Sequence, residues 1–185
     1  MSLNILNLRT LTFIVAGLLA SSATQAESYG FKGASLGSHL GLIANNPKYD
    51  CRAVRTPTAD RVCALGKDET ETMAGVPVRS VFYFYDQSIL TGVVVHLDET
   101  RFQTVLAALT GKYGPSNRAT ETVKNLGGKP FENQIHTWRQ GGESIVAQRY
   151  SGRLDQSSIR ILDDTAAARI KERRERTARQ PERDL

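Results

Sequence analysis

The sequence lacks the long apolar runs and the ligand-rich clusters that mark several large classes of protein. After Ala26 no apolar run approaches the roughly 20 residues that a transmembrane helix needs. The chain has three histidines and two cysteines, with neither an HExxH nor a CxxC spacing. It has no phosphate-cradling loop and no dinucleotide fingerprint, and its 185 residues are too few for a dinucleotide-binding enzyme fold or a (β/α)₈ barrel. We therefore expect one small domain without a cofactor.

The first 26 residues have the pattern of a secretory signal peptide. Arg9 supplies a positive charge, residues 11–20 form a short apolar stretch, and small residues follow as far as Ala26. We predict cleavage after Ala26, with an uncleaved N-terminal anchor as the alternative. The mature chain would then be a periplasmic or secreted protein without a transmembrane segment.

Export changes the interpretation of the two cysteines. Cys51 and Cys63 enclose a segment with Thr-Pro-Thr at its centre, which indicates a hairpin or Ω-loop whose ends meet. In an oxidising compartment a structural disulfide is the expected state. A metal pair or a catalytic thiol is the alternative, but the chain offers no second pair of ligands nearby.

Positive charge is concentrated at the C-terminus. Residues 27–164 carry 16 basic and 15 acidic side chains, whereas residues 165–185 carry seven basic and four acidic ones. The predicted domain, 27–164, is therefore nearly neutral, and the net charge of +5 comes mainly from the predicted tail, 165–185. This distribution argues against nucleic acid as a partner.

The pattern of elements predicts an α+β fold. Two strands rich in β-branched and aromatic residues are expected at 78–85 and 89–97, a helix at 102–113, and shorter strands near 132–139, 143–150 and 156–162. We expect an antiparallel sheet of about five to seven strands with helices packed on one face. The order is compatible with two αβ-type units side by side. Residues 67–77 and the segment before Pro130 are expected to be loops.

A charged helix is predicted to begin near Asp163 and Thr165. After Ala168 its one large apolar residue before Leu185 is Ile170, so it has little to bury, and a solvated helix is one interpretation. The other is an electrostatic contact with anionic lipid, cell-wall polymer or an acidic protein. The side chains that would make this contact are Arg169, Lys171, Arg173, Arg174 and Arg176.

Two groups of residues are candidates for a catalytic or metal-binding role. Residues 33–37 match the G-x-S-x-G pattern around Ser35, but that pattern works in a large parallel sheet, which this chain does not predict. His96 and Asp98 lie two apart on a predicted strand and so share a face, and His136 follows later. The three histidines, His39 included, have no metal-ligand spacing, so no catalytic or metal site is expected.

An aromatic surface is the better candidate for binding. Phe82 and Phe84 alternate with Tyr83 and Tyr85 on the first long strand, so one pair lies on each side of the sheet. Trp138 lies on a later strand. If one side is uncovered, its aromatic residues could bind a protein or a sugar polymer. Burial beneath a second layer or beneath the C-terminal helix is the alternative.

The chain resembles a loose group of small exported bacterial proteins of unassigned function with duplicated helix-plus-β-hairpin units. The stretches that carry the resemblance are 30–37, 78–97, 102–115 and 134–150. It implies an architecture of two such units forming one sheet, and an extracytoplasmic location. The Cys51 to Cys63 loop and the basic tail are not part of that pattern.

Taken together, the sequence predicts an exported, non-catalytic protein that binds a protein or polymer of the cell envelope. A periplasmic inhibitor or immunity protein is one alternative. The other is a small envelope hydrolase or metal-dependent enzyme that uses His96, Asp98 and His136. The oligomeric state is left open.

Overall fold

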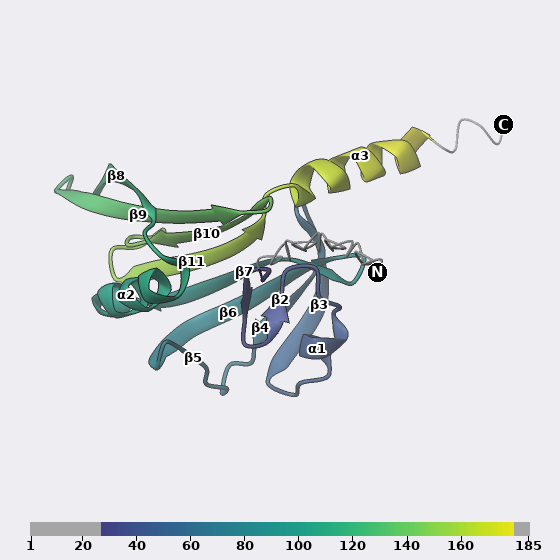
Figure 1. Cartoon of the computed structure of the whole chain (residues 1–185), viewed down its shortest axis with the longest axis horizontal. Coiled ribbons are helices and arrows are strands. Elements are labelled where there is room, and N and C mark those ends of the chain that lie inside the picture. The colour runs from purple at the N-terminus through teal and green to yellow at the C-terminus, as the bar shows by residue number, and fades with distance from the viewer. Residues whose placement is uncertain (1–26, 180–185) are drawn as a thin grey trace, which may run out of the picture.

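The computed structural model describes residues 27–179, so the predicted signal peptide lies outside the described residues. A nine-stranded antiparallel sheet in the order β3-β4-β6-β7-β11-β10-β9-β8, with β5 paired to β6, forms the body of the structure (Figure 1). A separate two-stranded hairpin, β1 and β2, accompanies it. The strands are β1 Gly30–Phe31, β2 Ala34–Ser35, β3 Tyr49–Thr56, β4 Ala59–Leu65, β5 Thr72–Met73, β6 Val76–Asp86, β7 Ile89–Asp98, β8 Asn117–Lys124, β9 Pro130–Gln140, β10 Glu143–Gln148 and β11 Gln156–Asp163. The helices are α1 Gly41–Ala44, α2 Phe102–Tyr113 and α3 Ala166–Arg179, and a 3₁₀ turn at Glu99–Arg101 precedes α2.

The sheet consists of two four-stranded meanders that meet at β7 and β11. One runs β3-β4-β6-β7 and the other β8-β9-β10-β11, each in chain order, and α2 connects them. The two join through antiparallel pairing of β11 with β7, for example Ile161 with Val93 and Ile159 with Val95. All registered pairings in residues 27–179 are antiparallel, which agrees with the predicted α+β class.

One face of this sheet carries the hydrophobic core. Along one row, directly paired residues from seven neighbouring strands point to the same side. The row is Cys51, Cys63, Tyr83, Val93, Ile161, Ile145 and Trp138. From α2, Phe102, Val105 and Leu109 are buried in the same cluster. The β1–β2 hairpin and α1 add to this side of the sheet, which we call the core face (Figure 1).

The predicted disulfide is confirmed. Cys51 and Cys63 lie directly opposite each other on β3 and β4, and they are bonded. Pro57 and Thr58 form the turn between these strands, so the segment is a hairpin rather than an Ω-loop. A disulfide indicates an oxidising compartment. Within residues 27–179 no helix is long and apolar enough to cross a membrane.

The sheet has more strands than the five to seven predicted. Residues 117–124 were expected to be a loop and instead form β8, which pairs with β9 over its full length. Its side chains are almost all exposed and polar, so the hydrophobic alternation that identifies a half-buried strand is missing. The strand exists because its partner β9 holds it at the edge of the sheet.

The prediction of a solvated C-terminal helix requires a correction. Ala166 and Ile170 are fully buried, although neither belongs to the main core cluster. The two terminal guanidinium nitrogens of Arg173, Nη1 and Nη2, donate to the Asp86 carboxylate at the end of β6. Arg174 donates to the backbone oxygens of Thr56 and Ala59 at the β3–β4 turn, at 2.8 and 3.3 Å. The helix is therefore seated on the ends of two hairpins.

Replacing both cysteines by alanine is expected to lower the free energy of unfolding by about 3 kcal/mol, because the unfolded chain regains the freedom that the closed loop removes. Urea denaturation measures this change. Addition of a reductant should lower the urea midpoint of the native protein nearly to that of the double variant. The midpoint of the double variant itself should not change. Equal midpoints for native and variant chains would contradict the prediction.

Ile170→Ala is expected to lower the free energy of unfolding by about 2 to 4 kcal/mol, as truncation of a fully buried side chain does. Lys171→Ala is the matched control, since that neighbouring side chain is 78% exposed. The control should stay within about 0.5 kcal/mol of the native protein. Equally small effects of both changes in thermal and urea denaturation would mean that α3 is not seated on the sheet.

Candidate functional site

The candidate catalytic residues do not converge. His96 pairs with Ser158 across β7 and β11, on the side of the sheet opposite the core face. His136 lies on the core face, where its ring is 6.3 Å from Phe102 and 6.5 Å from Trp138, centroid to centroid. Each histidine is bonded locally through Nδ1, His96 to the Ser80 hydroxyl at 2.9 Å and His136 to that of Ser116 at 2.8 Å. The enzyme hypothesis built on these two residues and Asp98 loses its geometric basis.

Asp98 has a local structural role. Its carboxylate accepts hydrogen bonds from the backbone nitrogen of Thr100, at 3.1 Å, and from the Thr100 hydroxyl, at 2.7 Å. It therefore caps the 3₁₀ turn that leads into α2, the role expected of an acid at this position. The Thr100 hydrogen bonds and the Arg79 ion pair at 2.9 Å lower the pKa of Asp98 to about 2.

Ser35 lies in β2, the second strand of the short N-terminal hairpin, rather than at a strand-to-helix turn. Gly33 forms the tip of this hairpin with a φ of 80°, which explains the glycine without catalysis. No cluster of three or more potential metal ligands occurs within residues 27–179. His39 is exposed and pairs across an isolated bridge with Ile89.

The aromatic residues of β6 divide between the two sides of the sheet. Tyr83 and Tyr85 are fully buried on the core face, where burial raises the pKa of Tyr85 to about 12. Trp138 is also buried there, and its Nε1 donates to the backbone oxygen of Gly114 at the end of α2 (2.8 Å). These three are thus core residues. Phe82 and Phe84 point to the opposite side and are half-buried.

The side of the sheet opposite the core face, which we call the open face, combines apolar and polar residues. Its residues form three rows across the strands, because paired residues share a side. The central row is Ala64, Phe82, Val94, Arg160, Val146 and Thr137. The flanking rows are Ser80, His96, Ser158, Gln148 and Ile135, and Val62, Phe84, Gly92, Leu162, Ser144 and Arg139.

The open face is less buried than the core face. Phe82, Val94, Val146 and Leu162 are all half-buried, in contrast to the fully buried Tyr83, Val93, Ile145 and Ile161 on the other side. The helix α2 and the β1–β2 hairpin both lie on the core face. The described chain therefore leaves the apolar side chains of the open face in partial contact with solvent.

Arg160 lies at the centre of the open face without an ionic partner among residues 27–179. It pairs directly with Val94 on β7 and Val146 on β10. Its Nε is buried without a hydrogen-bond partner, and its one side-chain hydrogen bond runs from Nη2 to the Gln148 oxygen at 3.4 Å. A half-buried guanidinium with unused donors is suited to bind a carboxylate or another anion.

Sequence reasoning did not identify Arg160. The available signal was its position between Ile159 and Ile161 on a predicted strand, where one charge interrupts a run of β-branched residues. Alternation alone places this charge on the side away from the two isoleucines. That this side remains open depends on where α2 packs, which the strand pattern does not reveal.

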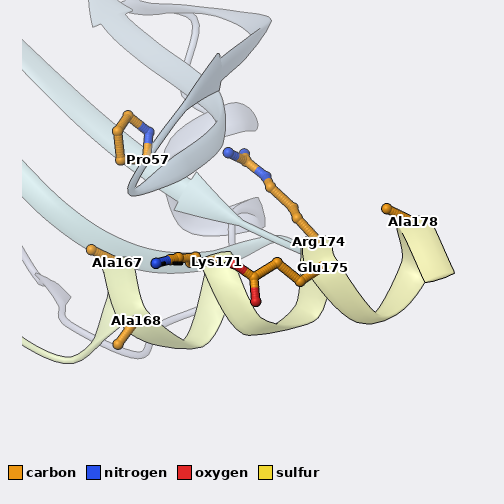
Figure 2. Close-up of a pocket in the computed structure, with 7 residues that line it drawn as sticks. All are labelled: Pro57, Ala167, Ala168, Lys171, Arg174, Glu175 and Ala178. Carbon is orange, nitrogen blue, oxygen red and sulfur yellow. Dashed lines mark ion pairs between the residues drawn. The ribbon is translucent and has the colours of Figure 1, made fainter.

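The basic residues of α3 are used in different ways. Arg169 pairs with Asp163 at 2.8 Å, and Arg173 and Arg174 hold the helix on the sheet. Lys171 and Arg176 are exposed and approach Glu175 and Glu172 at 3.9 and 3.7 Å. Figure 2 shows the side chain of Arg174 extending from α3 toward the hairpin turn that contains Pro57.

Three hollows lie elsewhere on the described part of the chain. A groove of about 550 Å³ runs between Pro57 and the small residues Ala167, Ala168 and Ala178 of α3 (Figure 2). Another of about 600 Å³ lies at the β8–β9 tip, beside the fully exposed Leu126. The third, of about 360 Å³, lies between α2 and the β1–β2 hairpin and is lined by the buried core residues Ile145 and Ile161.

Comparison of the chain with models of protein families, with curated proteins and with solved structures found no match.

Stability is expected to fall as the pH is lowered from about 7.5 to about 5.5. Burial lowers the pKa of both His96 and His136, with the nearby Arg118 charge contributing for His136. Below about pH 6.5 the two histidines therefore take up protons in the unfolded state before they do so in the folded state. The free energy of unfolding falls further as the pH approaches the lowered pKa values of these histidines in the folded protein.

A double variant, His96→Gln with His136→Gln, should show a weaker pH dependence of the urea midpoint over this range. His39→Gln is the control, because that side chain is exposed and its loss should leave the dependence as it is. A native protein whose midpoint is constant or rises on acidification would contradict this prediction.

Proposed function

We propose that the protein is an exported, non-catalytic binding protein, periplasmic or secreted, that holds a protein partner of the cell envelope on the open face of its sheet. The observation that carries the proposal is the combination on this face of half-buried apolar side chains with an arginine that has no ionic partner among residues 27–179. Such a surface is stabilised when a partner removes the apolar groups from water and supplies an acceptor for the charge.

The chemistry of the face favours a partner with an acidic group surrounded by apolar ones. Phe82, Val94 and Val146 lie in the same row as Arg160, so an incoming carboxylate would reach the guanidinium within an apolar surrounding. An ion pair formed there is screened less by water than one at an exposed edge. Aromatic residues and arginine are also the side chains most enriched at the centres of protein interfaces.

The disulfide supports the exported location, because disulfides form and persist in oxidising compartments. A sheet of this breadth, braced by the Cys51–Cys63 bond, also suits an inhibitor or immunity protein that covers the cleft of a partner enzyme. The separation of His96 and His136 onto opposite sides of the sheet favours binding over catalysis. The proposed activity requires no cofactor.

A photo-cross-linking side chain placed at Thr137, on the open face, should give one discrete adduct with an envelope protein in the producing cells. Thr137 pairs with Val146 beside Arg160 and is half-buried. The same group at Ala107, on the exposed side of α2, is the positional control and should give no such adduct.

The adduct should also depend on Arg160. Arg160→Gln is expected to reduce its yield at least fivefold, as loss of a desolvated ion pair of about 1 kcal/mol or more implies. Arg118→Gln is the matched control on the exposed edge strand β8. The proposal fails if both positions give the same adducts, or if Arg160→Gln leaves the yield at Thr137 unchanged. An adduct that contains a hydrolase or toxin would favour the inhibitor alternative.

A further inference from the structure

A second, independent feature lies on the core face, at the junction of the two elements that cover it. The helix α2 covers one part of this face, and the β1–β2 hairpin with the β5–β6 turn covers another. Between them remains a cleft of about 360 Å³, which we call the α2 cleft. This volume lies at the lower end of the range for small-molecule sites, about 300 to 1,000 Å³.

The walls of the α2 cleft are apolar. Val105 and Leu109 of α2 form one side, Phe31 and Met73 the other, and Ile145 and Ile161 of the sheet are also part of the lining. All six are buried, so core side chains form the inner part of the cleft, while Gly75, Ala108 and Lys112 at its mouth are exposed. An apolar chain placed there would gain contacts on both sides, whereas water finds few partners.

The rim of the α2 cleft carries positive charge. Lys32 and Lys112 stand on opposite elements, the β1–β2 turn and the last turn of α2. Glu71 pairs with Lys32 at 2.9 Å, whereas Lys112 forms no ion pair within residues 27–179 and instead lies over the Tyr113 ring, 5.0 Å from its centroid. Tyr113 packs edge to face on Tyr29, with the ring centroids 5.1 Å apart. Tyr113 also lines a smaller polar hollow of about 150 Å³, together with Glu27 and Ser28.

From this arrangement we propose that the α2 cleft binds a small amphiphile with one apolar chain and one anionic head group. The chain lies between α2 and the Phe31 and Met73 side chains, and the head group lies at the rim beside Lys112. Met73 is suited to this contact because an unbranched thioether adapts to the shape of a ligand. A free fatty acid and a phosphorylated lipid share this chemistry, and their head groups distinguish them.

Calorimetric titration of the full mature chain with hexanoate, octanoate and decanoate tests the proposal. Each added methylene should lower Kd about threefold to fourfold until the cleft is filled, as burial of apolar surface requires. Decanol should bind more weakly than decanoate, roughly two- to fivefold, because it lacks the charge that Lys112 attracts. Decyl phosphate in place of decanoate identifies which of the two head groups is preferred.

Two pairs of variants locate the site. Ala108→Trp fills the mouth of the cleft and should abolish binding, whereas Ala107→Trp, on the neighbouring exposed position of α2, should not. Lys112→Gln should remove the preference for decanoate over decanol, and Lys124→Gln on β8 should keep it. Circular dichroism verifies that each variant is folded.

The proposal is overturned if no probe binds, if affinity is independent of chain length, or if Ala107→Trp and Ala108→Trp behave alike. Equal affinities of the native protein for decanoate and decanol would contradict the proposed preference for an anionic head group. These outcomes are separate from those of the cross-linking experiment, because the α2 cleft and the open face lie on opposite sides of the sheet.

Discussion

The pairing of β11 with β7 is the interaction on which the rest of the structure depends. It joins two four-stranded meanders into one continuous sheet and places Val93, Ile161 and Ile145 in a single row. Because each strand alternates, this one register decides which side chains of both halves face α2 and which face away. The core face, the α2 cleft and the open face all follow from it.

A sheet with helices on one side must leave its other side to solvent, to a further layer or to a partner. Here α3 is seated on the ends of two hairpins through Asp86 and the carbonyls of Thr56 and Ala59. Most of the open face, including Arg160, is left without a covering element in the described chain. The charged helix thus acts first as a brace within the molecule, and Lys171 and Arg176 are the basic residues that it presents outward.

The sequence allowed the central strands, α2 and the disulfide to be predicted, because each has a strong local signal. The hairpin β6–β7 is rich in β-branched and aromatic residues, and Asp98 caps the turn before α2. Strand β8 was missed because its polar, exposed side chains have no alternation to detect. The seating of α3 was missed because it depends on only two buried apolar residues, Ala166 and Ile170, and on arginines whose partners are distant in sequence. The candidate site required three-dimensional information, since Arg160 matters only when its side of the sheet is known to be open.

The most direct test of this account is a comparison of neighbouring residues within β6 by hydroxyl-radical footprinting of the mature protein. Phe82 and Phe84 lie on the open face, and Tyr83 and Tyr85 lie in the core. The account predicts oxidation of the two phenylalanines and protection of the two tyrosines that alternate with them, although tyrosine is at least as reactive when free. Equal protection of all four would mean that the open face is covered, and oxidation of the tyrosines would mean that the core face is not closed.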